Sequence, residues 1–195
     1  MPDFFEKAEY IIEQNVHFLN FGNTYQLYDE RGVHLGNIQE RKYTWTRALR
    51  VFWRRSMGFE FDVLDNNGKT RLIARRGWSF LGYTPVRIYD ERQVLIGYIR
   101  KEFTLVNHGF EVQDAKRRRV ATLRGNWLSW NFTLEDAKGT PLAVIDKEWA
   151  GMRVELLTNA DKYRLQLLDA VYELTDTERV LVVAVGLLVD MLLKK

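Results

Sequence analysis

The fold is decided by the stretch Thr175-Asp-Thr-Glu-Arg-Val-Leu-Val-Val-Ala-Val-Gly-Leu-Leu-Val-Asp-Met-Leu-Leu-Lys-Lys195. Thr175 followed three residues later by Glu178 is a capping box, the pattern that begins a helix. From Val180 to Leu193 the only charged residue is Asp190. A helix that is apolar on every face has no side for solvent, so it must be buried all round.

Two environments can bury such a helix: a lipid bilayer, or the interior of the protein. At about 1.5 Å per residue, Asp176–Leu193 spans roughly 27 Å. A membrane-spanning helix needs about 20 predominantly apolar residues, whereas the apolar run here has fourteen and contains Asp190. We therefore expect a helix buried in protein, with a membrane tail anchor as the alternative. Asp190 is then a buried or mouth-proximal carboxylate that is hydrogen-bonded to the surrounding wall.

Upstream of this helix, one hairpin pattern occurs five times. In each copy apolar and polar residues alternate up to an Asp, and a second short strand follows the turn. The Asp carboxylate can accept hydrogen bonds from backbone N–H groups two residues on, which favours a type I turn closed by a bulge. The five turn residues are Asp29, Asp65, Asp90, Asp114 and Asp136.

Small residues mark these hairpins at two positions. Three turns carry a glycine three residues after the Asp, where its tolerance of positive φ is useful. We expect another turn type in the two copies that lack it. A second small residue follows the Asp after seven positions in four copies, and after nine in the second copy, which indicates that something approaches the backbone there. These residues are Gly36, Ala74, Gly97, Ala121 and Ala143.

The number of hairpins predicts the architecture. With a lead strand over Glu9–His17 and a final strand over Lys162–Leu168, the five hairpins give twelve strands. Period-2 strands, short turns and no alternating helices predict a mostly β fold, an antiparallel sheet closed into a barrel. A barrel of this many strands is too wide for side chains alone to fill. The apolar helix fits that space, and we expect a single domain over residues 1–195.

Composition excludes several function classes. The 195 residues contain no cysteine, which removes disulfides, thiolate catalysis, Cys-ligated zinc and S-palmitoylation. The N-terminal residues show no basic region followed by an apolar run, so we expect no secretory signal and a cytoplasmic location. No nucleophile elbow, phosphate loop or paired metal-ligand spacing is present. We therefore expect no catalytic site.

Charge is unevenly distributed along the chain. The net charge is only +3, but Arg41–Tyr89 holds eleven Lys and Arg against three acidic residues, a net +8. The remainder carries a net charge of −5. Such asymmetry indicates a surface for an anionic partner, either phosphate or lipid headgroup, or else a solvated barrel rim with counter-charges nearby.

The most basic stretch runs from Arg41 to Arg55, with six basic residues, two tryptophans and no acid. As a helix it places its tryptophans in one stripe and most arginines on other faces, which is typical of an interfacial membrane helix. The alternative is an element that caps the barrel, with Trp inward and Arg in solvent. The candidate lipid-headgroup residues are Arg41, Lys42, Trp45, Arg47, Arg50, Trp53, Arg54 and Arg55, extended by Arg75 and Arg76.

The whole pattern resembles the tubby C-terminal superfamily, a twelve-stranded barrel threaded by a C-terminal helix. Two of its branches fit: the phospholipid scramblase family and the LURP-one-related family. The more specific likeness is to the scramblase C-terminal signature, in order and approximate spacing. It is carried by Ile145–Gly151, Thr158–Tyr163, Arg179 and Leu188–Met191.

The scramblase resemblance implies a calcium-stimulated protein that lets phospholipids equilibrate between leaflets. It also implies an anionic phospholipid surface as partner and a peripheral position at the inner face of the membrane. The family's proposed calcium segment precedes the final helix and corresponds here to Asn159–Asp169. Ca²⁺ prefers six to eight oxygen ligands with several carboxylates, whereas Asn159, Asp161 and Asp169 offer three side chains. The alternative is that these are ordinary loop and strand-end polar residues.

Two function classes therefore stay open. The first is a membrane-associated, scramblase-like or lipid-headgroup-binding protein. The second is a soluble barrel that serves as a protein-interaction scaffold or small-ligand module without lipid activity. Nucleic-acid binding is not expected: aromatic residues beside Arg can stack bases, but the negative charge of the remainder opposes a broad footprint.

Overall fold

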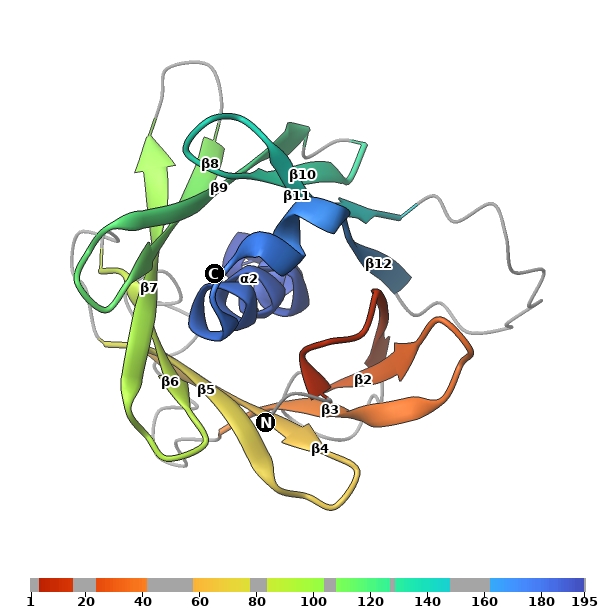
Figure 1. Ribbon diagram of the computed structural model, residues 1–195. Coiled ribbons are helices and arrows are strands. Elements are labelled where there is room, and N and C mark those ends of the chain that lie inside the picture. Colours follow the sequence, from red (N-terminus) through yellow and green to blue (C-terminus); the bar gives the residue numbers. More distant parts are fainter. Residues whose placement is uncertain are drawn as a thin grey trace.

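The computed structural model describes residues 4–15, 24–41, 58–77, 84–103, 108–126, 129–147 and 162–194. These residues form β-strands, a short 3-10 helix η2 and an α-helix α2 (Figure 1). The strands are β1 (Glu9–Asn15), β2 (Thr24–Asp29), β3 (His34–Glu40), β4 (Phe59–Asp65), β5 (Thr70–Arg76), β6 (Val86–Asp90), β7 (Leu95–Phe103), β8 (His108–Asp114), β9 (Arg119–Asn126), β10 (Asn131–Glu135), β11 (Pro141–Asp146) and β12 (Lys162–Leu167), followed by η2 (Asp169–Glu173) and α2 (Asp176–Lys194).

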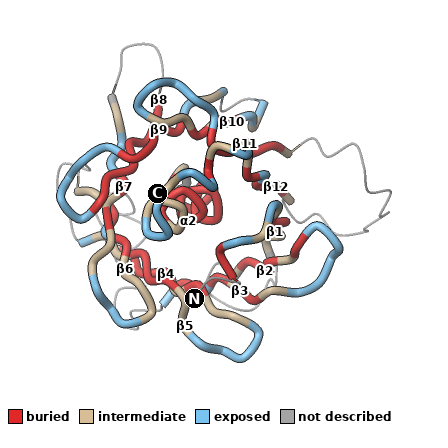
Figure 2. Tube along the Cα trace, in the orientation of Figure 1, coloured by how far each residue is buried: buried red, intermediate tan, exposed pale blue. Residues whose placement is uncertain are grey.

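The strands close into one antiparallel barrel. Each strand pairs with its neighbours in the chain, and β1 pairs with β12 to complete the ring, with Glu9 opposite Gln166. Apolar side chains alternate inward along the strands, so the red positions of Figure 2 line the interior and the pale-blue hairpin tips face solvent. The predicted twelve-stranded closed barrel is therefore confirmed.

Helix α2 runs through the interior of this barrel (Figure 1). It begins at the predicted capping box, where the Glu178 N–H lies 3.4 Å from the Thr175 hydroxyl and the Glu178 carboxylate accepts from the Thr175 N–H at 3.1 Å. Residues 181–192 are all buried. The helix is apolar on every face and is buried in the protein interior, as its sequence pattern predicts. No helix of the described ranges is long and apolar enough to span a bilayer.

All five Asp turns have the same geometry. In each, the Asp Oδ1 atom accepts from the backbone N–H groups two and four residues later, at 2.7–3.0 Å. A register shift of the predicted bulge kind follows each turn. The expectation of a different turn type in two copies is wrong. Gln93 and Arg117 adopt the left-handed conformation, at φ 61° and 66°, where the other turns use glycine.

Two of the small hairpin residues lie against a neighbouring strand, and one of them also lies against the helix. A Cβ on Gly97 would meet the Gln113 carbonyl oxygen of β8 and lie 2.7 Å from Leu181 Cδ2 of α2, so here the helix does approach the strand. A Cβ on Gly36 would collide with the backbone of Leu64 on β4. The helix also has its own close contact, because a Cβ on Gly186 would lie 2.5 Å from Leu165 Cδ2 of β12.

The barrel has two distinct ends. The five Asp turns and the first turn of α2 lie at one end, which we call the turn end. At the opposite end, which we call the far end, β3 finishes at Glu40, β4 begins at Phe59 and β5 finishes at Arg76. Candidate sites are found at both ends and on the outer wall between them.

Candidate functional site

The buried part of α2 carries a carboxylate, Asp190. Asp190 of α2 is 1% exposed and accepts a 2.7 Å hydrogen bond from the hydroxyl of Tyr25 on β2. Nearby, the Tyr163 hydroxyl of β12 donates to the Leu187 carbonyl of α2 at 2.9 Å. The expected bond from Asp190 to the barrel wall is confirmed. These two contacts fix the rotation of α2 and its position along the barrel axis.

Burial dominates the chemistry of both tyrosines. Desolvation, with the nearby Asp190 charge and its hydrogen bond, raises the pKa of Tyr25 above its usual range. Desolvation and Asp190 likewise raise the pKa of Tyr163. Both phenols therefore stay protonated and act as hydrogen-bond donors at neutral pH. This arrangement suits a structural link between helix and wall.

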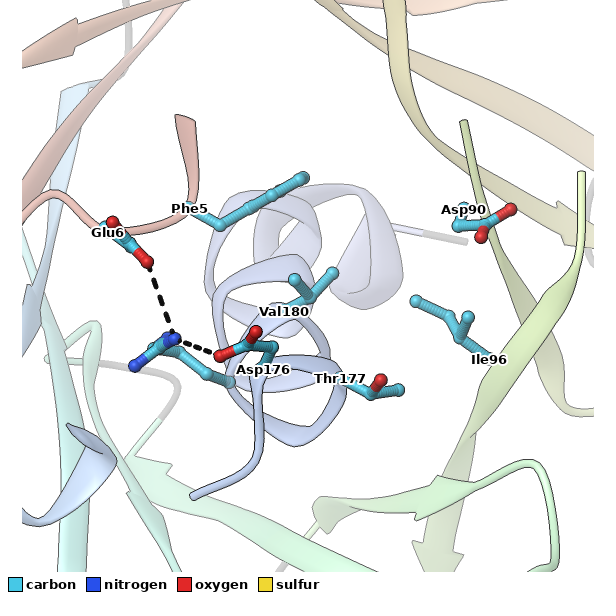
Figure 3. A pocket seen from close by; sticks show the side chains of 8 residues that line it. Phe5, Glu6, Asp90, Ile96, Asp176, Thr177 and Val180 are labelled. Atoms are coloured by element: carbon cyan, nitrogen blue, oxygen red, sulfur yellow. Dashed lines mark hydrogen bonds and ion pairs between the residues drawn. The ribbon is translucent and has the colours of Figure 1, made fainter. Parts of the chain in front are cut away.

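A small cleft of about 140 Å³ opens at the turn end (Figure 3). Apolar side chains of Phe5, Ile96 and Val180 line it, together with charged groups from the N-terminal segment and from α2. Arg179 forms ion pairs with Asp176 at 2.6 Å and with Glu6 at 3.6 Å. The charges at this cleft thus join the N-terminal segment to the start of the helix.

An acid–base cluster occupies the outer wall at the far end, across β3, β4 and β5. Glu60 is 2% exposed, and its Oε1 atom lies 2.6 Å from Arg41. Arg75 donates to both Glu60 oxygens, to Oε2 at 2.7 Å and to Oε1 at 3.1 Å. Arg41 also binds Asp62 at 2.9 Å. Side chains of Arg41 and Arg75 remain 50% and 41% exposed. Two acids therefore hold two arginines in fixed positions while part of each guanidinium still faces solvent.

Arg76 differs from Arg75 because strand alternation points it to the other side. Its guanidinium lies 4.7 Å from the centre of the Phe59 ring, a cation–π contact. Burial lowers the pKa of Arg76, but an arginine stays charged at neutral pH. The far end therefore presents basic side chains on both the outer and the inner side of the sheet.

The structure places only part of the predicted headgroup site. Arg41, Arg75 and Arg76 come together at the far end because β3, β4 and β5 are adjacent strands. The other predicted residues lie outside the described ranges and stay predictions: Lys42, Trp45, Arg47, Arg50, Trp53, Arg54 and Arg55. They follow Arg41 directly in the chain, where β3 has reached the far end.

The predicted calcium residues are also only partly described. Asp169 begins η2 and is exposed, at the turn end of β12. Asn159 and Asp161 precede β12 and lie outside the described ranges. Among the residues whose placement is known, no three His, Asp or Glu side chains are grouped in a way that holds a metal ion. The calcium site therefore stays a prediction from resemblance.

The sequence interpretation missed a second basic region, at the β8–β9 turn. Lys116, Arg117, Arg118 and Arg119 are consecutive and all exposed. In the sequence these residues were interpreted only as a turn. The signal that could have found them is the run of four basic residues itself, which is unusual in a two-strand connection.

Comparison with known proteins gives a consistent result. The family model described as Scramblase matches residues 7–193. Altered inheritance rate of mitochondria protein 25 from Saccharomyces cerevisiae is 24% identical over 183 residues, covering 78% of this chain and 56% of its own length. A phospholipid scramblase family protein from Schizosaccharomyces pombe is 24% identical over 172 residues, covering 80% of this chain and 45% of its own. The chain thus spans about half the length of these curated relatives.

A solved structure is similar in fold. An X-ray structure of a protein from Arabidopsis thaliana superposes with a TM-score of 0.52 at 11% identity, covering 94% of this chain and 93% of that one. At this identity the likeness concerns the fold alone.

Proposed function

This chain belongs to the scramblase family, and on that premise we propose that it is a scramblase-like protein that binds the headgroups of anionic phospholipids. It would act as a peripheral protein at the inner face of a membrane and promote exchange of phospholipids between leaflets. The single observation that carries the proposal is the family match over residues 7–193, which includes every described strand and all but the last residue of α2.

The far end supplies the chemistry that such binding needs. Arg41 and Arg75 are held on the outer wall by Glu60 with part of each guanidinium exposed. An anionic lipid surface attracts each nearby Lys or Arg by about 1 kcal/mol. The predicted segment 42–55 continues from Arg41 and adds five basic residues and two tryptophans. Tryptophan is a side chain that favours the membrane–water interface.

Vesicle flotation tests the binding step. We expect the protein to float with vesicles that contain phosphatidylserine and to stay at the bottom with purely zwitterionic vesicles. Binding should weaken as salt is raised, because surface electrostatics are screened. The double variant Arg50→Glu/Arg54→Glu should abolish flotation, whereas Arg31→Glu/Lys138→Glu, at the exposed tips of two hairpins, should float like the parent. Absence of flotation by the parent would refute the proposal, and unchanged flotation of the first variant would remove segment 42–55 from the binding site.

Lipid exchange needs a separate measurement. Vesicles with a fluorescent phospholipid in both leaflets lose half the signal when a membrane-impermeant reductant reaches only the outer leaflet. Bound protein that scrambles lipid should drive the signal towards complete loss. Calcium and chelator arms, with Asp161→Asn beside the parent, test the calcium prediction. Flotation without extra signal loss would leave headgroup binding intact and remove the scrambling activity from the proposal.

A further inference from the structure

Two arginines face each other across neighbouring strands. Arg75 on β5 and Arg87 on β6 are direct partners in the register. Both point outward, because Ala74 and Ile88 beside them are fully buried on the inner side. Like charges directly opposite each other in an antiparallel pair are unfavourable. Glu60 compensates the charge of Arg75, so Arg87 is the member of the pair whose charge the stability of the sheet does not explain.

The row continues onto β7 with an aromatic ring. Tyr98 is the register partner of Arg87 on the other side, and strand alternation points it outward beside the buried Gly97 and Ile99. The guanidinium of Arg117 lies 3.4 Å from the centre of the Tyr98 ring. Arg117 therefore reaches from the β8–β9 turn to the Tyr98 ring on β7. Its position is fixed by a cation–π contact.

The β8–β9 turn adds further positive charge around this ring. Lys116 and Arg119 are exposed on either side of Arg117 and Arg118. Arg118 forms an ion pair with Asp114 at 2.6 Å, so we do not count it as part of the unpaired charge. We call the set Arg87, Tyr98, Lys116, Arg117 and Arg119 the Tyr98 surface. It carries four positive charges and no acid of its own.

Neighbouring carboxylates are already bound by other arginines. Glu60 holds Arg41 and Arg75, and Glu111 holds Arg100 at 2.5 Å. Within the part of the chain that the structure describes, Arg87, Lys116 and Arg119 have no carboxylate within ion-pair distance. Arg119 interacts electrostatically with Glu111, but Arg100 already binds that carboxylate, so the Tyr98 surface keeps a net positive charge.

We infer that the outer wall formed by β5–β8, centred on the Tyr98 surface, is the face of the barrel that lies against an anionic phospholipid membrane. This inference rests on the proposed function and adds the orientation. The charges are spread over an open wall and not around a cleft, which suits contact with many headgroups. Tyr98 offers an aromatic side chain with a polar tip, a type enriched at membrane interfaces. Arg75 links this wall to the cluster at the far end.

The orientation gives a definite picture of the bound state. The barrel would lie on its side, with α2 inside it roughly parallel to the membrane and not inserted. In the ring of strands, β12 and β1 are diametrically opposite β6 and β7. The exposed side chain of Gln166 on β12 would then face away from the lipid.

Matched charge variants test the surface. Arg87→Gln/Lys116→Gln removes two charges from it, and Arg31→Gln/Lys138→Gln removes two from other hairpins. Lys116, Arg31 and Lys138 each stand two residues after the turn Asp, so their backbones are equivalent. On phosphatidylserine vesicles we expect roughly fivefold weaker binding per lost charge, thus about twenty-five-fold for the first double variant. The second should change binding by less than about threefold.

Single labels test the orientation directly, since the chain has no cysteine. Ala115→Cys and Ala137→Cys introduce one thiol at the same turn position in two hairpins, and Gln166→Cys marks the opposite wall. With a fluorophore on each and a quencher on the lipid headgroups, quenching should be strongest for Ala115→Cys and weakest for Gln166→Cys. Soluble inositol phosphate that displaces the protein only partially would be consistent with many weak headgroup contacts.

The outcomes separate the two claims. If the parent does not bind anionic vesicles, the proposed function fails, and this inference fails with it. If the parent binds but the two double variants lose affinity equally, or the three labels are quenched equally, binding stands and the Tyr98 surface is refuted. Complete displacement by soluble inositol phosphate at micromolar concentration would also overturn it, in favour of a single-headgroup site.

Discussion

The interior of the barrel and its outer β5–β8 wall differ in whether their charged side chains have partners. Inside, the buried carboxylate of α2, Asp190, accepts a hydrogen bond from Tyr25. On the wall, Arg75 and Arg87 stand opposite each other in the register, and Arg87 has no carboxylate partner among the described residues. The interior is arranged for stability, because buried polar groups without partners are costly. The wall keeps unfavourable charge, which indicates a role outside the barrel.

This difference shows where each kind of substitution should act. Changes in the interior should alter the free energy of unfolding and leave membrane affinity of the folded protein unchanged. Changes on the wall should alter affinity and barely affect stability. The following variants test that separation, from the largest expected effect to the smallest.

Deleting Arg179–Lys195 should unfold the domain. The deletion removes the buried part of α2 from a barrel whose strands cannot fill the interior alone. Far-ultraviolet circular dichroism and a thermal melt should show loss of the cooperative transition. A folded truncate that has lost only its membrane affinity would contradict the assignment of α2 to the interior and favour a tail anchor.

Gly97→Ala should destabilise the protein by about 1–3 kcal/mol, the usual cost of overpacking. The new Cβ would lie 2.7 Å from Leu181 Cδ2, and closer still to a backbone oxygen of β8. Gly77→Ala is the matched control, because no atom lies within 4 Å of a Cβ there. Urea denaturation measures both. Equal midpoints for the two variants would show that α2 does not approach β7 as described.

Alkaline pH should weaken the interior through its buried tyrosines. Desolvation raises the pKa of Tyr10, Tyr25 and Tyr163 in the folded state. Their contribution to the free energy of unfolding is therefore fully present below the unfolded pKa of 10.0 and is lost as pH rises above it. Above that pH, each such tyrosine lowers the free energy of unfolding by about 1.4 kcal/mol per pH unit.

Tyr25→Phe isolates one of these groups. It should reduce the alkaline slope, and at neutral pH it should cost about 1–3 kcal/mol because Asp190 loses the phenol donor. Tyr172→Phe is the control, since Tyr172 is 45% exposed. Urea midpoints measured at about pH 8 and pH 11, on either side of the ordinary tyrosine pKa, provide the test. An unchanged slope in Tyr25→Phe would contradict the burial argument.

Arg87→Thr should have the smallest effect on the free energy of unfolding, and it should stabilise the protein where the other variants destabilise it. Removing the like-charge partner of Arg75 should stabilise the sheet by about 0.2–1 kcal/mol, while affinity for anionic vesicles falls. Arg87→Lys, which keeps the charge, should leave both nearly unchanged. A loss of stability in Arg87→Thr would mean that Arg87 has a structural partner, and the contrast between wall and interior would weaken.

Much of the barrel was predictable because its signals are local. Thr175 and Glu178 mark the helix start, and each turn Asp binds N–H groups only two and four residues away. The turn type at Gln93 and Arg117 was missed for a physical reason. The two Asp hydrogen bonds and the bulge impose a left-handed residue, and together they offset a backbone cost on the order of 1 kcal/mol.

The surfaces were less predictable because they depend on register. Arg41, Glu60 and Arg75 meet only because β3, β4 and β5 are adjacent. Arg87, Tyr98 and Arg117 meet only because two strand pairings and a turn bring them together. A one-residue slip in either pairing would turn these side chains to the other face. The charge excess of Arg41–Tyr89 pointed to this side of the barrel without giving its partners.

The pairing of β1 with β12 has a consequence for how the chain is made. Glu9 pairs with Gln166, so the contact that closes the ring joins residues far apart in sequence. Topologies dominated by such distant pairings fold slowly, in milliseconds to seconds. During synthesis the early hairpins must emerge with open strand edges and an apolar inner face, both prone to aggregation. We expect the nascent chain to depend on chaperones until α2 has left the ribosome.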